Sequence, residues 1–179
     1  MELADILREV EGKVNAEGVG FHFKRATLYG ISEPLPNGLG YEIEKELEHG
    51  DIYDLLESDR ASEVAQQYPY VAIMTAGWAT PLPDGKDVPD IAPSMSPDKK
   101  RIRLMVIGAR GTTEFVSAIR FSDNPDKLII DEGHAQGAMA DALIQLMSDK
   151  KAKPEMPDFL RKFLTGAEEH YRKQGSDDE

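Results

Sequence analysis

The chain has 179 residues, of which 40% are hydrophobic and 30% are charged, and it contains no cysteine. The missing cysteines exclude a disulfide framework, a thiolate zinc site, an iron–sulfur cluster and a cysteine nucleophile. A formal net charge of −12 argues against direct binding to nucleic acid or to anionic membranes, because both attract basic surfaces. Residues 1–14 lack targeting character, and the longest apolar run, residues 70–78, is too short to span a bilayer, so we expect a cytoplasmic protein.

Changes in hydrophobic periodicity predict the elements of the first half. Residues 2–14 carry one helical stripe, and residues 19–31 alternate apolar and polar side chains as a half-buried strand does. Residues 39–48 fit either a second strand or the start of a helix. Residues 51–67 predict a helix that ends before Pro69.

The second half predicts strands first. Residues 70–78 are nearly uncharged and rich in strand-forming residues, which is typical of a strand buried on both faces. Residues 101–109 and 114–121 predict a hairpin with its turn at residues 110–112. A further turn is expected at residues 123–126, followed by a short strand at 128–130.

Helices close the predicted order. One covers residues 135–149 and another begins near Pro157, before an acidic tail at 174–179 that we expect to be disordered. We therefore predict a single α+β domain over residues 1–173, an antiparallel β-meander with helices packed against it. The order of elements resembles the profilin-like and roadblock-like α/β/α sandwiches, a likeness that carries no function.

A proline-rich stretch, residues 79–98, separates the buried strand from the hairpin. A loop of about 20 residues in a compact domain is uncommon and is often functional. Trp78, the sole tryptophan, precedes it and is a candidate binding residue, since Trp is enriched at binding hot spots but also common in cores. Ser94 lies within the loop, and the sequence does not identify a base that would make it a nucleophile.

The densest basic run follows this loop and consists of Lys99, Lys100, Arg101 and Arg103. Arg101 and Arg103 are two residues apart on a predicted strand, so their side chains share one face. That face could bind an anionic ligand, but the excess of acids favours internal pairing or a solvated edge.

The best candidate for catalysis is the cluster of Asp131, Glu132 and His134, where a strand ends and a helix begins. Two carboxylates and an imidazole could bind a divalent cation or perform acid–base chemistry. The ordinary alternative is a helix cap. Nucleotide-binding, metalloprotease, hydrolase and calcium-binding motifs are absent from the sequence, so whether the protein is an enzyme stays open and no cofactor is predicted.

Residues 42–63 form an acidic band in which nine acidic residues face two basic ones, a local charge of −7. The band could contact a basic partner or mimic the charge of nucleic acid. A solvated surface that aids solubility is the ordinary alternative.

A series of short motifs runs from residue 77 to residue 142: GWATP, PSMSPD, KKRIRLMVI, VSAIRF, DNPD and GAMADA. The segment at about residues 70–147 resembles an uncharacterised family of actinobacterial and actinophage proteins with the pattern GWA-x-P, PS-x-x-P and R-[VI]-R-L. The chain departs from that family by AIRF in place of an LRF ending and by a second serine, Ser96. The resemblance implies a compact bacterial or phage protein and nothing about catalysis. It singles out Trp78, Ser94, Pro97, Arg101, Arg103, Arg120 and Asp126.

Together these features predict a non-enzymatic binding or regulatory module of bacterial or phage origin. Its binding surface would be the 79–98 loop with the adjacent basic strand, and the candidate binding residues are Trp78, Ser94, Arg101, Arg103 and Arg120. Another protein is the expected partner, and the sequence leaves a homo-oligomer open. The alternatives are an enzyme centred on Asp131, Glu132 and His134, and an acidic nucleic-acid mimic acting through residues 42–63.

Overall fold

The computed structural model describes residues 2–22, 24–38, 40–80, 92–132 and 138–148. The chain divides into two compact units, Met1–Asp149 and Lys150–Glu179, and all described residues lie in the first. The helix expected from Pro157 and the tail expected at 174–179 lie outside the described residues. A single domain extending to residue 173 therefore stays a prediction.

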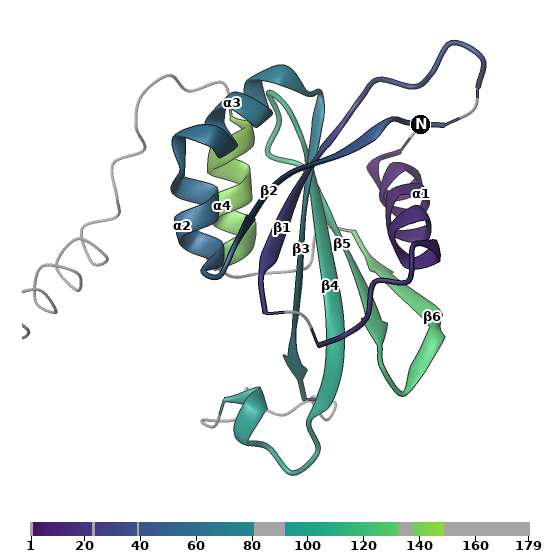
Figure 1. The fold of residues 1–179 in the computed structure, drawn as a ribbon, viewed down its shortest axis with the longest axis vertical. Coiled ribbons are helices and arrows are strands. Elements are labelled where there is room, and N and C mark those ends of the chain that lie inside the picture. Colours follow the sequence, from purple (N-terminus) through teal and green to yellow (C-terminus); the bar gives the residue numbers. More distant parts are fainter. Residues whose placement is uncertain (1, 23, 39, 81–91, 133–137, 149–179) are drawn as a thin grey trace, which may run out of the picture. The chain divides into compact units, whose positions relative to one another are not determined.

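The described strands form one six-stranded antiparallel sheet with helices on both faces (Figure 1). In sheet order they are β2 (Ile43–His49), β1 (Ala26–Ile31), β3 (Tyr70–Ala79), β4 (Lys100–Ala109), β5 (Phe115–Phe121) and β6 (Asn124–Asp131). One face is covered by α1 (Leu3–Ala16), and the other by α2 (Ile52–Glu57), α3 (Asp59–Gln67) and α4 (Ala138–Met147). A 3₁₀ turn, η1 (Pro93–Met95), precedes β4. The predicted α+β class is confirmed, with β3 to β6 following one another as a meander.

The sheet separates two hydrophobic cores because successive strand residues point to opposite faces. On one face, Leu7 and Val10 of α1 belong to the same core as Met74 of β3. On the other, Leu55 of α2 belongs to the same core as Ile73 of β3. Strand β3 is thus buried on both faces over residues 71–74, as its uncharged sequence predicts.

The first predicted strand is too long at its beginning. Strand β1 covers only Ala26–Ile31, and all six of its residues are buried, so it is not half-buried as expected. It lies between β2 and β3, with helices over both faces, so a fully buried strand is the physical consequence. Residues 17–22 and 24–25 form an irregular connector between α1 and β1, named the α1–β1 connector below.

Two further boundaries differ from the predictions. Residues 43–49 are the strand β2, so residues 43–48 of the ambiguous stretch are strand and not helix, while residues 40–42 are irregular and residue 39 lies outside the described residues. The single helix predicted over 51–67 is two helices, because Ser58 has extended backbone with ψ 149 between them. The Ser58 hydroxyl caps α3 by accepting a hydrogen bond from the Ala61 amide.

The last predicted turn and strand are also placed differently. The turn lies at residues 122–123, and β6 already begins at Asn124, where a turn was expected. Pro125 is compatible with a strand here because β6 is an edge strand, so its missing N–H need not pair with a neighbour. The hairpin of β4 and β5 is confirmed.

Candidate functional site

The far ends of β3 and β4 extend beyond the helices on both faces of the sheet, toward η1 (Figure 1). The two strands pair in register over ten residues each, as far as Ala79 and Lys100. Trp78 lies opposite Arg101 in this register, so the two side chains share one face of the sheet. That face is the one covered by α1, because Arg103, two residues further along β4, contacts Glu11 of α1.

Trp78 is partly exposed and bracketed by two cations. Its side chain is 38% exposed, and the Lys99 ammonium and the Arg101 guanidinium carbon lie 4.9 and 5.0 Å from the ring centroid. Each such cation–π contact contributes about 0.5–1 kcal/mol at an exposed site. Trp78 is therefore held in place at the surface rather than packed in a core.

Both cations also bind backbone that borders the indole. Lys99 Nζ donates to the Ser94 carbonyl of η1 at 3.0 Å, and Arg101 Nε donates to the Phe21 carbonyl of the α1–β1 connector at 2.7 Å. Met95, next to Ser94, is 76% exposed. We name the group of Trp78, Met95, Lys99 and Arg101 the Trp78 surface.

Ser94 contacts the Trp78 surface through its backbone, and only part of the proline-rich loop lies among the described residues. The contact that the structure shows for Ser94 is made by its carbonyl, while the hydroxyl of the buried Ser96 accepts from the Asp98 amide at 3.2 Å. Residues 81–91 of the predicted 79–98 loop lie outside the described residues. The part of the predicted loop that reaches the Trp78 surface is therefore its C-terminal end, at η1.

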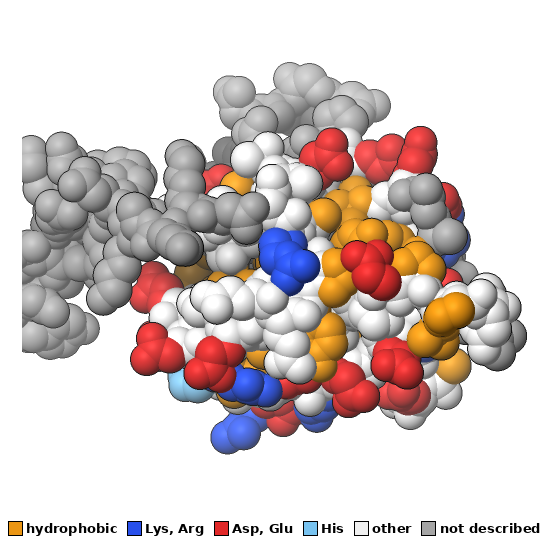
Figure 2. Space-filling model, turned by 90° about the horizontal axis from the view of Figure 1, so that it is seen from above, with side chains coloured by type: hydrophobic (Ala, Val, Ile, Leu, Met, Phe, Trp, Pro, Cys, Tyr) orange, Lys and Arg blue, Asp and Glu red, His pale blue; other side chains and the backbone are white. Residues whose placement is uncertain are grey.

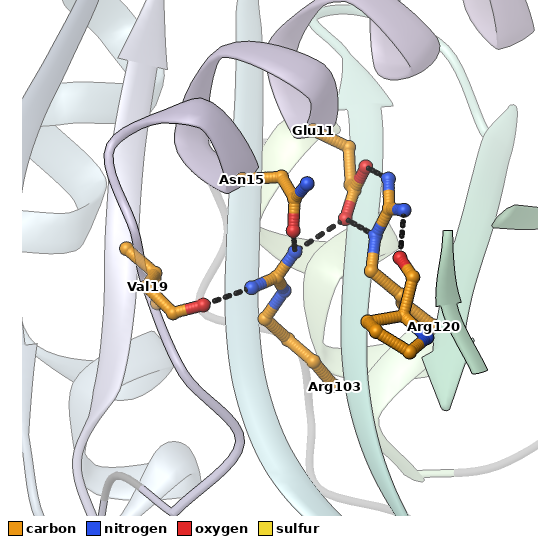
Figure 3. A network of polar contacts seen from close by, with 6 residues as sticks. Glu11, Asn15, Val19, Arg103 and Arg120 are labelled. Atoms are coloured by element: carbon orange, nitrogen blue, oxygen red, sulfur yellow. Dashed lines mark hydrogen bonds and ion pairs between the residues drawn. The ribbon is translucent and has the colours of Figure 1, made fainter. Parts of the chain in front are cut away.

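The other two predicted binding residues, Arg103 and Arg120, are buried at 2% and 7% exposure. Both guanidiniums point toward Glu11 of α1 (Figure 3). Arg103 Nη2 donates to Glu11 Oε1 at 2.7 Å and to Asn15 Oδ1 at 2.7 Å. Arg120 binds both oxygens of the same carboxylate, with its Nε 2.8 Å from Oε1. This is the internal pairing that the excess of acids favours, and it places the two arginines away from the Trp78 surface.

The Glu11 carboxylate is the centre of this buried network. Burial by itself would raise the pKa of Glu11, but hydrogen bonds from Arg120 and Arg103 outweigh burial and hold the pKa below its ordinary value. Arg103 also donates to the Val19 carbonyl, and Arg120 to the Pro125 carbonyl. The network therefore ties α1, the α1–β1 connector and three strands together, and its role is structural.

The α1–β1 connector lies over the arginines of β4. Arg101 and Arg103 bind its Phe21 and Val19 carbonyls, and the Phe21 ring lies 5.2 Å from the Arg103 guanidinium carbon. Gly18 has φ +81, a conformation that side chains other than glycine rarely adopt. Val19 and Phe21 therefore alternate as strand residues do, but they lie in a connector that covers Arg101 and Arg103. This is why the start of the first strand was predicted wrongly.

The cluster of Asp131, Glu132 and His134 is described only in part. Asp131 is the last residue of β6, Glu132 is exposed, and His134 lies outside the described residues. Among the residues that the structure describes, no group of three His, Asp or Glu side chains could hold a metal ion. Whether these residues form a site or a helix cap therefore stays a prediction.

The acidic band, residues 42–63, lies on β2, α2 and α3 and is partly neutralised by its own two cations. Arg60 binds Glu46 at 2.6 Å and Glu63 at 3.0 Å, and Lys45 binds Glu48. The Tyr68 hydroxyl donates to Glu46 at 2.6 Å, and this hydrogen bond, with burial, raises the pKa of Tyr68 to about 12. Acidic side chains are also spread around the end of the molecule that Figure 2 views from above.

Four residues of these sites were not predicted from the sequence, namely Glu11, Asn15, Phe21 and Met95. Glu11 had a detectable signal, because it occupies a position on the buried stripe of α1, four residues after Leu7. A charged residue on such a stripe predicts a buried ion pair. The others had no comparable signal, since their partners are set by tertiary packing.

Comparisons of this chain with protein-family models, with curated proteins and with solved structures found no match. The resemblance to actinobacterial and actinophage proteins therefore stays a prediction. Within the described part of the chain, no helix has the length and apolar character needed to cross a membrane.

Proposed function

We propose that the protein is a non-enzymatic binding or regulatory module of a bacterial or phage-infected cytoplasm, and that its Trp78 surface engages another protein. The observation that supports this most is the position of the sole tryptophan. Trp78 is 38% exposed at a strand end beyond the helices, between two cations. Exposed tryptophan is among the side chains that contribute most to protein–protein binding, because one residue buries a large apolar area.

The surface is organised before any partner binds. Lys99 and Arg101 each contact the indole and a backbone carbonyl, of Ser94 and Phe21 respectively, so the ring is fixed between η1 and the α1–β1 connector. Binding then costs little conformational entropy, which favours affinity for a given contact area.

The cations indicate the chemistry of the partner. The contact of Arg101 with Phe21 uses Nε, which leaves the Nη donors for an acceptor on the partner. A segment that carries a carboxylate beside an apolar side chain fits both the guanidinium and the indole. Because the chain has a net charge of −12, this attraction acts only locally, within a Debye length of about 8 Å at physiological salt. We therefore expect binding to weaken as salt is added.

Site-specific photocrosslinking in the source cells tests this proposal. A benzophenone amino acid replaces Met95, which is 76% exposed within the Trp78 surface, and a matched control replaces Tyr53, which is 46% exposed on α2. We expect a discrete protein adduct from position 95 that is missing from position 53 and is lost when Trp78→Ala is added. Equal adducts from both positions, or an adduct that survives Trp78→Ala, would contradict the proposal.

A further inference from the structure

A row of apolar side chains crosses β4, β5 and β6 on the sheet face opposite Trp78. Leu104, Ile119 and Ile129 are neighbours in the strand register, and Ile102 and Phe121 form the adjacent row. This is the face of α2, α3 and α4, because Val106, two residues after Leu104 on β4, belongs to the same core as Leu143 of α4. We name these five residues the distal apolar face.

The distal apolar face is only partly covered. Ile129 is 38% exposed, Leu104, Ile119 and Phe121 are half-buried, and Ile102 is buried at 8% exposure. A Cβ atom built on Gly77, which pairs with Ile102 in the register, would meet nothing within 4 Å. The helices on this face make their main contacts with β1 to β4. A contiguous apolar surface that is left partly exposed in this way is typical of an interaction surface.

The edge strands themselves are protected against pairing with another strand. Strand β6 carries Pro125 and Lys127, and β2 carries alternating charges and a register shift opposite Leu28 and Tyr29. Proline, lysine and bulges at sheet edges oppose the addition of a further strand. A partner is therefore expected on the face of β6 rather than along its edge.

Charge indicates a second copy of the same chain as that partner. Two lysines and two aspartates border the distal apolar face. Lys100 binds Asp123 at 3.2 Å. Lys127 and Asp131 lie on the same face as Ile129, because alternate residues of a strand share a face. This surface is therefore locally neutral in a chain of net charge −12, so two copies can approach here with little repulsion.

The spacing on β6 is also self-complementary. Lys127 and Asp131 lie two residues before and two residues after Ile129. A two-fold axis near Ile129, with the two β6 strands antiparallel, brings Lys127 of each copy opposite Asp131 of the other. Symmetric dimers require such a match, because the same patch must complement itself.

We propose that the distal apolar face is the interface of a symmetric homodimer, with Ile129 near the two-fold axis. This inference is independent of the proposed function, because Trp78 lies on the opposite face of the sheet and stays accessible in such a dimer.

Sedimentation velocity of the full chain across micromolar concentrations tests the proposal. We expect a dimer, and we expect Ile129→Arg to raise the dimer Kd by at least about thirtyfold, the effect of losing an interface hot spot. Trp78→Arg is the matched control, since Trp78 is also 38% exposed but lies on the opposite face of the sheet, and it should leave the dimer unchanged. Circular dichroism and thermal unfolding verify that each variant is folded.

Charge reversal tests the symmetry itself. Lys127→Asp alone and Asp131→Lys alone should each weaken the dimer, because each brings like charges together, and the double exchange should restore it. A monomeric native chain, a dimer that Ile129→Arg leaves intact, or a double exchange that fails to restore dimerisation would overturn the proposal.

Discussion

Replacing Glu11 by glutamine removes the carboxylate to which both Arg103 and Arg120 donate. Glu11 is 2% exposed, and the two guanidiniums around it are 2% and 7% exposed, so water cannot replace the lost charge. Glutamine keeps one acceptor oxygen but turns an N–H₂ group toward two buried cations. Breaking a buried ion network by removing one partner typically costs about 3–5 kcal/mol, and we expect the free energy of unfolding to fall by that amount.

Urea denaturation at pH 7 measures this loss directly. The matched control is Asp5→Asn, because Asp5 pairs with Arg8 at 3.2 Å on the same helix but is 56% exposed. Exposed pairs contribute about 0–1 kcal/mol, so the control should remain close to the native chain. A loss below about 1 kcal/mol for Glu11→Gln would refute the structural role assigned to the network.

The same residue predicts an acid-dependent stability. Because the pKa of Glu11 is lowered in the folded state, its contribution is fully present above the ordinary glutamate pKa of about 4.3 and is lost as the pH falls through the folded-state pKa. The difference in stability between the native chain and Glu11→Gln should therefore shrink on acidification below about pH 4. A difference that stays constant down to pH 2 would contradict this assignment.

Three further predictions concern other parts of the fold. Gly30→Ala should lower the free energy of unfolding by about 1–3 kcal/mol, because the added methyl group overlaps the Tyr68 ring, and urea denaturation measures it. The pKa of Tyr68 is raised to about 12, so absorbance titration should show one tyrosine that ionises late, and Glu46→Gln should lower its pKa. Because the pKa is higher in the folded state, the stability that depends on Tyr68 should decline as the pH rises above about 10. Trp78→Ala should change the melting temperature little, because the ring is partly exposed and its two cation–π contacts are worth about 0.5–1 kcal/mol each; a collapse of the fold would instead assign Trp78 to the core.

The α+β class could be predicted because alternation, an uncharged run of strand-forming residues and turn residues mark five of the six strands. The ends of individual helices and strands were harder to predict from the sequence. The alternation of Val19 and Phe21 is that of a strand, yet these residues lie in the connector whose carbonyls accept from arginines of β4. Ser58 is a good helix cap, but the apolar stripe continues on both sides of it and hides the break.

Of the predicted binding arginines, Arg101 lies at the Trp78 surface and Arg103 and Arg120 are buried. The local sequence does not contain the tertiary contact that separates them. Spacing shows that Arg101 and Arg103 share a face, and this is confirmed by their contacts with the same connector. Spacing does not show that α1 places Glu11 over Arg103, because the two residues are 92 positions apart in the chain. The same tertiary contact leaves Arg101 beside Trp78 and takes Arg103 and Arg120 out of the surface.

Because Trp78 is the sole tryptophan, one spectroscopic signal can test whether the Trp78 surface binds the partner. A chain labelled with 5-fluorotryptophan gives a single ¹⁹F resonance, from Trp78. Adding the unlabelled partner identified by crosslinking should shift this resonance and reduce its sensitivity to solvent, and Arg101→Ala should weaken the effect, because Arg101 contacts the ring. A partner that binds the chain while the Trp78 resonance and its solvent sensitivity stay unchanged would contradict the account.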